Sequence, residues 1–145
     1  MLVRSALSLV LCSCLVASAV CKDKPTVKIK HLEPMLYPEI ARIARLQGRI
    51  SLRLRISSAG AVLDAQANAT DTLLKEHPLL QRETARAVRR WTFECANCPP
   101  EAEYAHVVTF VYRLEGPEAQ HSTSHFTLDS PEHVTVTTNP PQVNW

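Results

Sequence analysis

An alternating segment between residues 49 and 56 constrains the fold more than any other feature of this chain. Its even-numbered side chains are all large and apolar, whereas its odd-numbered ones are arginine or serine. Because successive side chains of a β-strand point to opposite faces, the alternation predicts a strand with one buried and one solvated face. Turn residues at 57–60 and a second alternating segment extend the prediction to a hairpin. The predicted inward side chains of its second strand are Leu63, Ala65, Ala67 and Ala69.

Two segments with helical spacing flank this hairpin. The first begins at Tyr37-Pro38, because proline is tolerated at the first helical position, and ends at Gln47-Gly48. Its predicted buried stripe consists of Tyr37, Ile40, Ala41 and Ala44. The second helix covers residues 79–90, and its predicted inner stripe consists of Leu80, Thr84, Ala87, Val88 and Trp91. Helices and a hairpin in this order indicate an α+β fold.

The most strongly β-forming segment runs from Ala105 to Leu114. One predicted face consists of Val108, Phe110, Tyr112 and Leu114, and the other of Val107, Thr109, Val111 and Arg113. The second face is more apolar than the outer faces of the hairpin strands, which indicates that it is covered or meets a partner. Shorter strands are predicted at 27–32 and, within the tail, at 126–129 and 133–138, before Pro140-Pro141.

The first 21 residues predict export from the cytoplasm. A single positive charge at Arg4 precedes an uncharged run, and Ala17-Ser18-Ala19 fits the small-x-small pattern of a cleavage site. A signal peptide spanning residues 1–19 is therefore the leading interpretation. Two others stay open, an uncleaved membrane anchor and a lipoprotein signal in which Cys21 is lipidated. All three place the rest of the chain outside the cytoplasm, where thiols tend to oxidise.

Cys95 and Cys98 are close enough in the sequence to close a small disulfide loop, and a structural disulfide is the leading interpretation. Free thiols, a redox pair and a metal site remain alternatives. A redox Cys-x-x-Cys normally begins a helix, which Pro99-Pro100 opposes here. Zinc ligation would also need His121 and His125, but the 22 residues between the two pairs exceed the gap of a usual zinc finger.

Composition and motifs argue against several classes of function. The formal net charge of +2 lacks the strong basic excess that is typical of nucleic-acid-binding proteins. The chain has only three glycines and no glycine-rich phosphate loop, and no nucleophile motif frames a serine, histidine or aspartate. We therefore expect no enzymatic activity, and no cofactor, metal, small-molecule substrate or nucleic-acid partner.

The charges are nevertheless distributed unevenly along the chain. Residues 22–93 carry 14 basic and 7 acidic side chains, whereas residues 94–145 carry one basic and seven acidic side chains. Such an asymmetry either steers a charged partner or lets the two parts of the surface pair with each other.

An ordered set of short motifs resembles one known family. The set consists of Tyr37-Pro38 with Ala41-Arg42, Gly48 at the start of a strand, the turn residue Gly60, His77-Pro-Leu-Leu80, and Ala87-Val88 leading to Trp91-Thr-Phe93. Over residues 31–114 it is similar to the C-terminal domain of TonB energy transducers. The resemblance implies a small sheet of three antiparallel strands with two helices on one face. It also implies a periplasmic domain that recruits the TonB box of outer-membrane transporters as an added strand at the sheet edge.

The chain also departs from a full transducer. The first 21 residues lack the histidine that a motor-coupling anchor usually carries, and no proline-rich spacer follows them. We therefore expect a stand-alone domain at residues 26–115 and a tail at residues 116–145, whose strands could pair with the edge that a TonB box would use. The predicted partner-binding edge consists of Val107, Thr109, Val111 and Arg113.

Two functional hypotheses follow from the resemblance and the departures. In the first, the chain is a periplasmic binding module that engages an envelope or outer-membrane transport partner at a sheet edge. In the second, it is a structural envelope protein whose own tail seals that edge. A homodimer is compatible with both, because TonB-type domains form dimers as a family. Lipidation of Cys21 would attach either one to a membrane.

Overall fold

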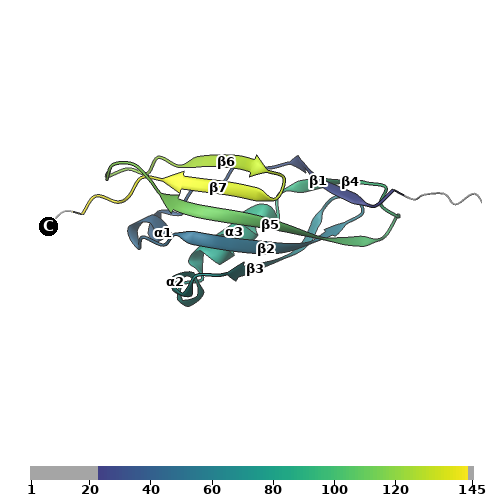
Figure 1. Cartoon of the computed structure of the whole chain (residues 1–145), viewed down its shortest axis with the longest axis horizontal. Coiled ribbons are helices and arrows are strands. Elements are labelled where there is room, and N and C mark those ends of the chain that lie inside the picture. Colours follow the sequence, from purple (N-terminus) through teal and green to yellow (C-terminus); the bar gives the residue numbers. More distant parts are fainter. Residues whose placement is uncertain (1–22, 144–145) are drawn as a thin grey trace, which may run out of the picture.

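The structure is a computed structural model, and it describes residues 23–143 (Figure 1). The predicted signal peptide and Cys21 lie outside this range. The described residues form an α+β fold with seven strands and three helices, as the sequence predicts for the fold class. None of the helices in residues 23–143 is both long and apolar enough to cross a membrane.

A five-stranded sheet is the largest element of the fold, with the strand order β3-β2-β5-β7-β6. Strands β2 (Gly48–Ser57) and β3 (Val62–Ala69) form the predicted hairpin, and β5 (Glu103–Leu114) pairs antiparallel with β2. Strand β7 (His133–Thr138) then pairs parallel with β5, and β6 (His125–Ser130) pairs antiparallel with β7. The tail strands therefore extend the central sheet on its β5 side (Figure 1).

A second, two-stranded sheet consists of β1 (Thr26–His31) and β4 (Thr92–Ala96), paired antiparallel. It is tied to the hairpin turn by the Phe93 N–H, which donates to the Gly60 carbonyl at 2.8 Å. Gly60 has φ +88°, and a Cβ there would lie 1.8 Å from the Phe93 carbonyl oxygen. The turn therefore needs glycine both for its backbone conformation and for this close approach.

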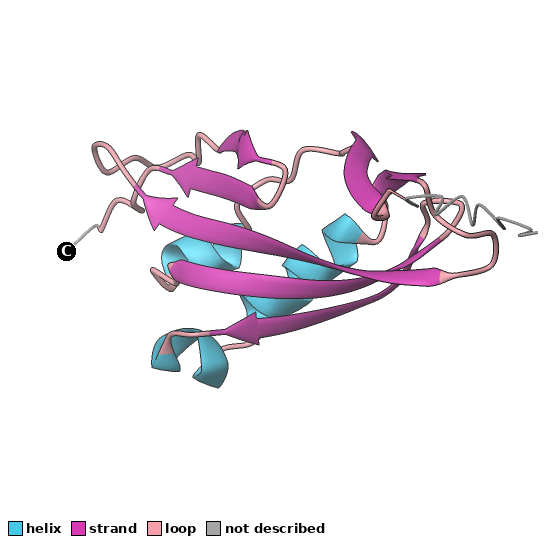
Figure 2. Ribbon diagram, turned by 45° about the vertical axis from the view of Figure 1, so that its right-hand side comes forward, coloured by secondary structure: helices cyan, strands magenta, loops and turns pink. Residues whose placement is uncertain are grey.

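Three helices complete the fold: α1 (Glu39–Ile43), α2 (Thr72–Glu76) and α3 (Leu79–Val88). Helix α3 lies across one face of the central sheet (Figure 2). Its predicted inner stripe is confirmed, since every member is at most 7% exposed. These side chains meet the inner faces of β2 and β5, whose alternating apolar residues are likewise buried, to form one hydrophobic core.

The expected sheet of three antiparallel strands is only part of what the structure contains. The tail strands enlarge the sheet because Val134 and Val136 of β7 are fully buried in the core and Phe126 of β6 packs against it. The parallel β5–β7 pair also makes the sheet mixed rather than antiparallel. Helix α2, at Thr72–Glu76, adds a third helix to the two that the resemblance implies.

The predicted stripe of the first helix is wrong at two positions. Helix α1 ends at Ile43 rather than at residue 47, because Arg45 takes the left-handed conformation with φ +53°. Ile40 is 69% exposed and Ala44 is also exposed, whereas Arg42 is buried. A helix of five residues is too short for its periodicity to decide which face turns inward.

Leu63 is the other misplaced side chain. A register shift in the β2–β3 pair opposes Ile56 to Val62 and Arg55 to Asp64, so that Leu63 is the extra residue of a β-bulge. Its side chain is 46% exposed instead of buried. The remaining inward positions of β3 follow the prediction, with Ala65 and Ala69 buried and Ala67 half-buried.

Candidate functional site

The main-chain groups of β5 alternate between two neighbouring strands. The Thr109 N–H donates to the Glu132 carbonyl at 2.7 Å, and the Glu115 N–H donates to the Thr138 carbonyl at 2.8 Å. Both bonds point away from β2, towards the hairpin of β6 and β7. Because main-chain groups alternate along a strand, the N–H groups of Val107, Val111 and Arg113 point the same way. The residues of the predicted partner-binding edge therefore share one side of the strand.

Strand β7 covers only part of that side. Its register runs from Thr109, opposite His133, to Leu114, opposite Thr138. Among the described residues, no strand pairs with this side of β5 between Glu103 and Val107. Val107, whose side chain is 49% exposed, lies in this open half. Three of the four predicted edge residues thus face β7, and the fourth does not.

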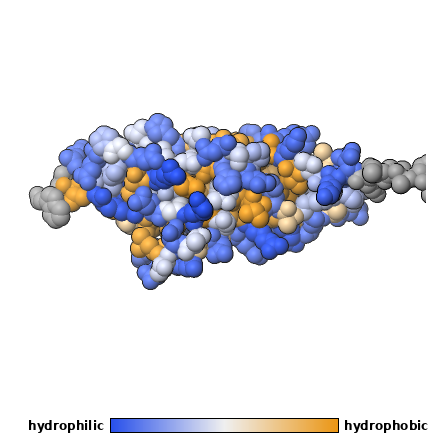
Figure 3. Space-filling model, viewed as in Figure 1, coloured by the Kyte–Doolittle hydropathy of each residue, from blue (hydrophilic) through white to orange (hydrophobic). Residues whose placement is uncertain are grey.

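The side chains of these residues point to the sheet face opposite the core. Val107 and Arg113 are exposed there, and Thr109 and Val111 are partly exposed. Figure 3 shows that apolar side chains on this side of the molecule form scattered patches among hydrophilic ones. Recognition of a partner at this edge would therefore depend mainly on main-chain hydrogen bonds, with Val107 and Val111 as the apolar contacts.

Arg42 of α1 holds the connection that leads from β5 to the tail strands. Its side chain is only 2% exposed. The guanidinium donates to both carboxylate oxygens of Glu39, at 2.9 and 2.6 Å, and to the carbonyls of Ala119 and Gln120 at 3.1 and 3.0 Å. A planar guanidinium suits this arrangement because its donors spread in a fixed fork. Hydrogen bonding to Arg42 lowers the pKa of the Glu39 carboxyl, so that this carboxyl stays ionised.

Further contacts tie the tail to α1 and to the core. The Tyr37 main-chain N–H donates to the Ser124 hydroxyl at 3.1 Å, and Arg45 pairs with Glu118 at 3.0 Å. On the inner face, the Phe126 ring meets Trp91 edge to face, with 6.3 Å between the ring centroids. The tail is therefore docked through both polar and apolar contacts. The sequence analysis named Arg42 within the family motifs but not as a buried or functional residue, and a further local signal for it was Glu39 three residues earlier.

Two tyrosines beneath the sheet form a buried polar cluster. Tyr112 shares a 2.6 Å hydrogen bond with the Thr84 hydroxyl and lies 3.5 Å from the Met35 sulfur, and the Tyr37 hydroxyl donates to the Leu46 carbonyl. Burial raises the pKa of both tyrosine hydroxyls. Both groups therefore stay protonated and hydrogen-bonded, which suits a role in joining α1, α3 and β5 rather than in proton transfer.

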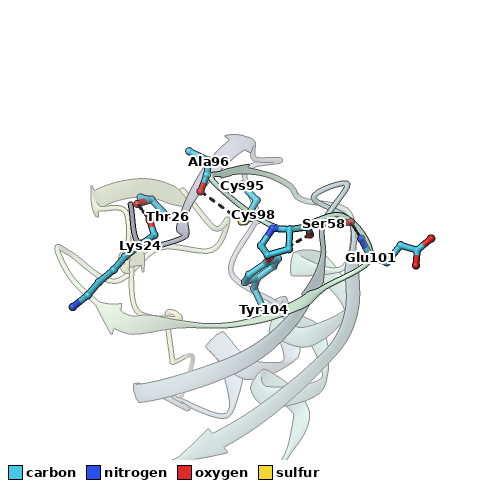
Figure 4. The surroundings of a disulfide bond; sticks show 9 residues. Lys24, Thr26, Ser58, Cys95, Ala96, Cys98, Glu101 and Tyr104 are labelled. Atoms are coloured by element: carbon cyan, nitrogen blue, oxygen red, sulfur yellow. Dashed lines mark hydrogen bonds between the residues drawn. A yellow bond between two sulfur atoms is a disulfide. The ribbon is translucent and has the colours of Figure 1, made fainter. Parts of the chain in front are cut away.

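Cys95 and Cys98 lie where β4 leads into the loop before β5 (Figure 4). Their sulfurs are at bonding distance and their Cα atoms are 5.6 Å apart, within the range of a disulfide. The loop is fastened by the Glu101 N–H, which donates to Ser58, and by the Tyr104 hydroxyl, which donates to the Pro99 carbonyl. In residues 23–143, no group of three or more His, Cys, Asp or Glu side chains is arranged to hold a metal ion.

A comparison with known families gives one match. The family model of the Gram-negative bacterial TonB protein C-terminal domain matches residues 33–114. This range begins after β1 and ends with the last residue of β5, so that β6 and β7 lie outside it. No curated protein and no solved structure matches the chain.

The matched range covers more than half of the chain and contains the helices and strands that carry the resemblance seen in the sequence. Domains of this family are periplasmic, non-enzymatic and engaged in protein–protein interactions for envelope transport. The chain therefore belongs to the TonB C-terminal domain family, as a transport-related protein-interaction domain.

Proposed function

We propose that this chain is a periplasmic binding module that takes up an extended segment of an envelope or outer-membrane transport partner as an added strand along β5. The observation that carries the proposal is the direction of the β5 main chain. The Thr109 N–H already donates to a strand on the side away from β2. A partner segment would use the same donors, those of Val107, Thr109, Val111 and Arg113.

The open half of β5 provides a place for a partner segment to begin pairing. Between Glu103 and Val107 the edge carries no strand among the described residues, so a segment could pair there first. Pairing beyond Thr109 would then require β7 to leave. Pairing in this short half alone contributes little binding free energy, because its few main-chain hydrogen bonds do not offset the entropy cost of ordering an extended peptide.

Export and attachment complete the proposal. Cleavage after Ala19 would release the domain into the periplasm, and lipidation of Cys21 would instead hold it at a membrane. Since β1 begins at Thr26, a lipidated Cys21 would leave only a short link between the membrane and the folded domain. The bond between Cys95 and Cys98 fits this oxidising compartment.

The second candidate function is structural. Val134 and Val136 are fully buried and Arg42 binds the tail main chain, which are features of an integral part of a fold. In that case the tail seals the β5 edge permanently, and the domain serves envelope architecture or self-association.

Proline substitutions in the full chain test the first function. Val107→Pro removes a donor that points away from β2 in the half of β5 that β7 does not cover, and we expect it to abolish binding of a synthetic TonB-box peptide while circular dichroism stays unchanged. Ala67→Pro is the matched control, because the Ala67 N–H points away from β2 at the opposite edge of the sheet, on β3. Equal binding by both variants would show that the peptide does not dock on β5.

A further inference from the structure

We propose that the C-terminal hairpin, β6 and β7, is a displaceable internal competitor that occupies the β5 edge and must peel away before a partner strand can pair beyond Thr109. This inference rests on the proposed function of the β5 edge and adds a means of regulating it.

The hairpin uses the donors that an incoming strand would need. Thr109 and Glu115 donate to main-chain carbonyls at the two ends of the β7 pairing, Glu132 and Thr138. Strand addition by a partner would form the same kind of bonds with the same groups. The hairpin and the partner segment therefore cannot occupy Thr109–Leu114 together.

The position of the hairpin in the sheet allows it to leave as one unit. Among the described strands, in the order β3-β2-β5-β7-β6, only β7 of the hairpin pairs with the rest of the sheet, and β6 is the outer strand. Separating β7 from β5 breaks one strand interface and leaves β2, β3 and β5 paired. The connection begins at Gly116, which has φ +87° and no atom within 4 Å of the position that a Cβ would take. Nothing packed around this residue therefore opposes a change of direction.

Polar contacts hold the hairpin in addition to the buried side chains of Val134 and Val136. Residues 115–143 contain four acidic side chains and no lysine or arginine, and they dock on a part of the chain with a basic excess. Glu118 pairs with Arg45, and the Arg42 guanidinium binds the carbonyls of Ala119 and Gln120. Arg42 lies in α1 and Arg45 follows its C-terminal end, so this helix and the residues after it hold the connection to the hairpin.

Native-state hydrogen exchange of the full chain tests the inference without any partner. Odd-numbered amides of β5 from Thr109 to Arg113 face β7, whereas the even-numbered amides of Phe110 and Tyr112 face β2. If the hairpin opens by itself, the odd amides exchange at least tenfold faster than the even amides of the same strand. Equal exchange rates would overturn the proposal, because the hairpin would then open only when the domain unfolds.

A reversible cross-link provides the second arm. Val111 is aligned with Thr135 in the β5–β7 register, so a disulfide between Val111→Cys and Thr135→Cys, here called the staple, holds the hairpin against β5. Arg53→Cys with Gln66→Cys is the matched control, because it joins β2 to β3 and leaves both the β5 edge and the hairpin free. The probe is a synthetic TonB-box peptide, and its affinity is measured with and without reductant.

We expect the staple between β5 and β7 to weaken peptide binding at least tenfold and mild reduction to restore it, while the control cross-link leaves binding unchanged. Equal binding by the stapled and reduced forms would contradict the proposal. If the peptide binds none of the forms, the proposed function fails, and the exchange experiment alone then decides whether the hairpin opens.

Discussion

The Arg42 guanidinium and the Glu39 carboxylate form a two-point ion pair, 2.6 and 2.9 Å long, on one side of α1. Glu39 is about half exposed, whereas Arg42 is buried between α1 and the connection to the tail. The pair therefore fixes the orientation of the buried guanidinium, whose remaining N–H groups donate to main-chain carbonyls. Through Arg42, helix α1 of the family domain thus holds the connection that leads to β6 and β7.

Replacing Arg42 tests how much its contacts with the connection to the tail strands stabilise the fold. Arg42→Leu removes the guanidinium donors of the Gln120 and Ala119 carbonyls, of which Ala119 keeps only the Gln142 N–H, and we expect it to lower the free energy of unfolding by about 2–4 kcal/mol in urea titrations. Arg45→Leu is the matched control, because Arg45 and Glu118 are both half exposed and such pairs contribute about 1 kcal/mol or less. Equal losses in the two variants would contradict the special role of Arg42.

The pH dependence of stability gives a second prediction. The pKa of the Glu39 carboxyl is lowered in the folded state by its hydrogen bonds to Arg42. The ionised Glu39 carboxylate therefore stabilises the fold at pH values above the pKa of glutamate in the unfolded chain, about 4.3. This contribution is lost as the pH falls through the lower pKa that Glu39 has in the folded state. We expect Glu39→Gln to be less stable than the unsubstituted chain at pH 6, with a difference that shrinks in acid. A difference that stays constant down to pH 2 would argue against the pair.

The cysteine pair gives a third prediction. Cys95 and Cys98 should be bonded to each other in exported protein. Because the loop between them is short, replacing both with serine should lower the free energy of unfolding by only about 2 kcal/mol or less. The melting temperature should therefore fall modestly, and the fold should stay intact. Alkylation under non-reducing conditions measures the bond. Two free thiols would refute it, and stoichiometric zinc would restore the metal alternative.

Processing gives a fourth prediction. If the small-x-small site is cleaved, protein from the cell envelope begins at Val20, and its intact mass lacks residues 1–19. A mass that retains Met1 to Ala19 would contradict cleavage and favour the anchor. A chain that begins at Cys21 with an added diacylglycerol would favour the lipoprotein instead.

Long periodic segments could be predicted from the sequence, because many large side chains agree on one face. The inward residues of β2, from Ile50 to Ile56, and the inner stripe of α3 are all buried as the spacing predicts. The family was likewise recognisable, because its motifs occur in order over the range that the family model matches.

The features that the sequence did not disclose depend on long-range contacts. Arg42 is buried because it meets Glu39 and main-chain carbonyls 77 and 78 residues further along the chain, which no local pattern records. The parallel pairing of β7 with β5 was not predictable either, since a period of two gives the face of a strand but not the direction of its neighbour. The Leu63 bulge shifts that period by one residue.

The most direct test of the account follows the main-chain amides of the isotope-labelled full chain by NMR while a synthetic TonB-box peptide is added. The account predicts that the β5 amides facing away from β2, those of Val107, Thr109, Val111 and Arg113, change most, and that the amides of β6 and β7 lose protection as the hairpin leaves. Changes confined to β3, or to the outer edge of β6 with the hairpin still paired to β5, would contradict it.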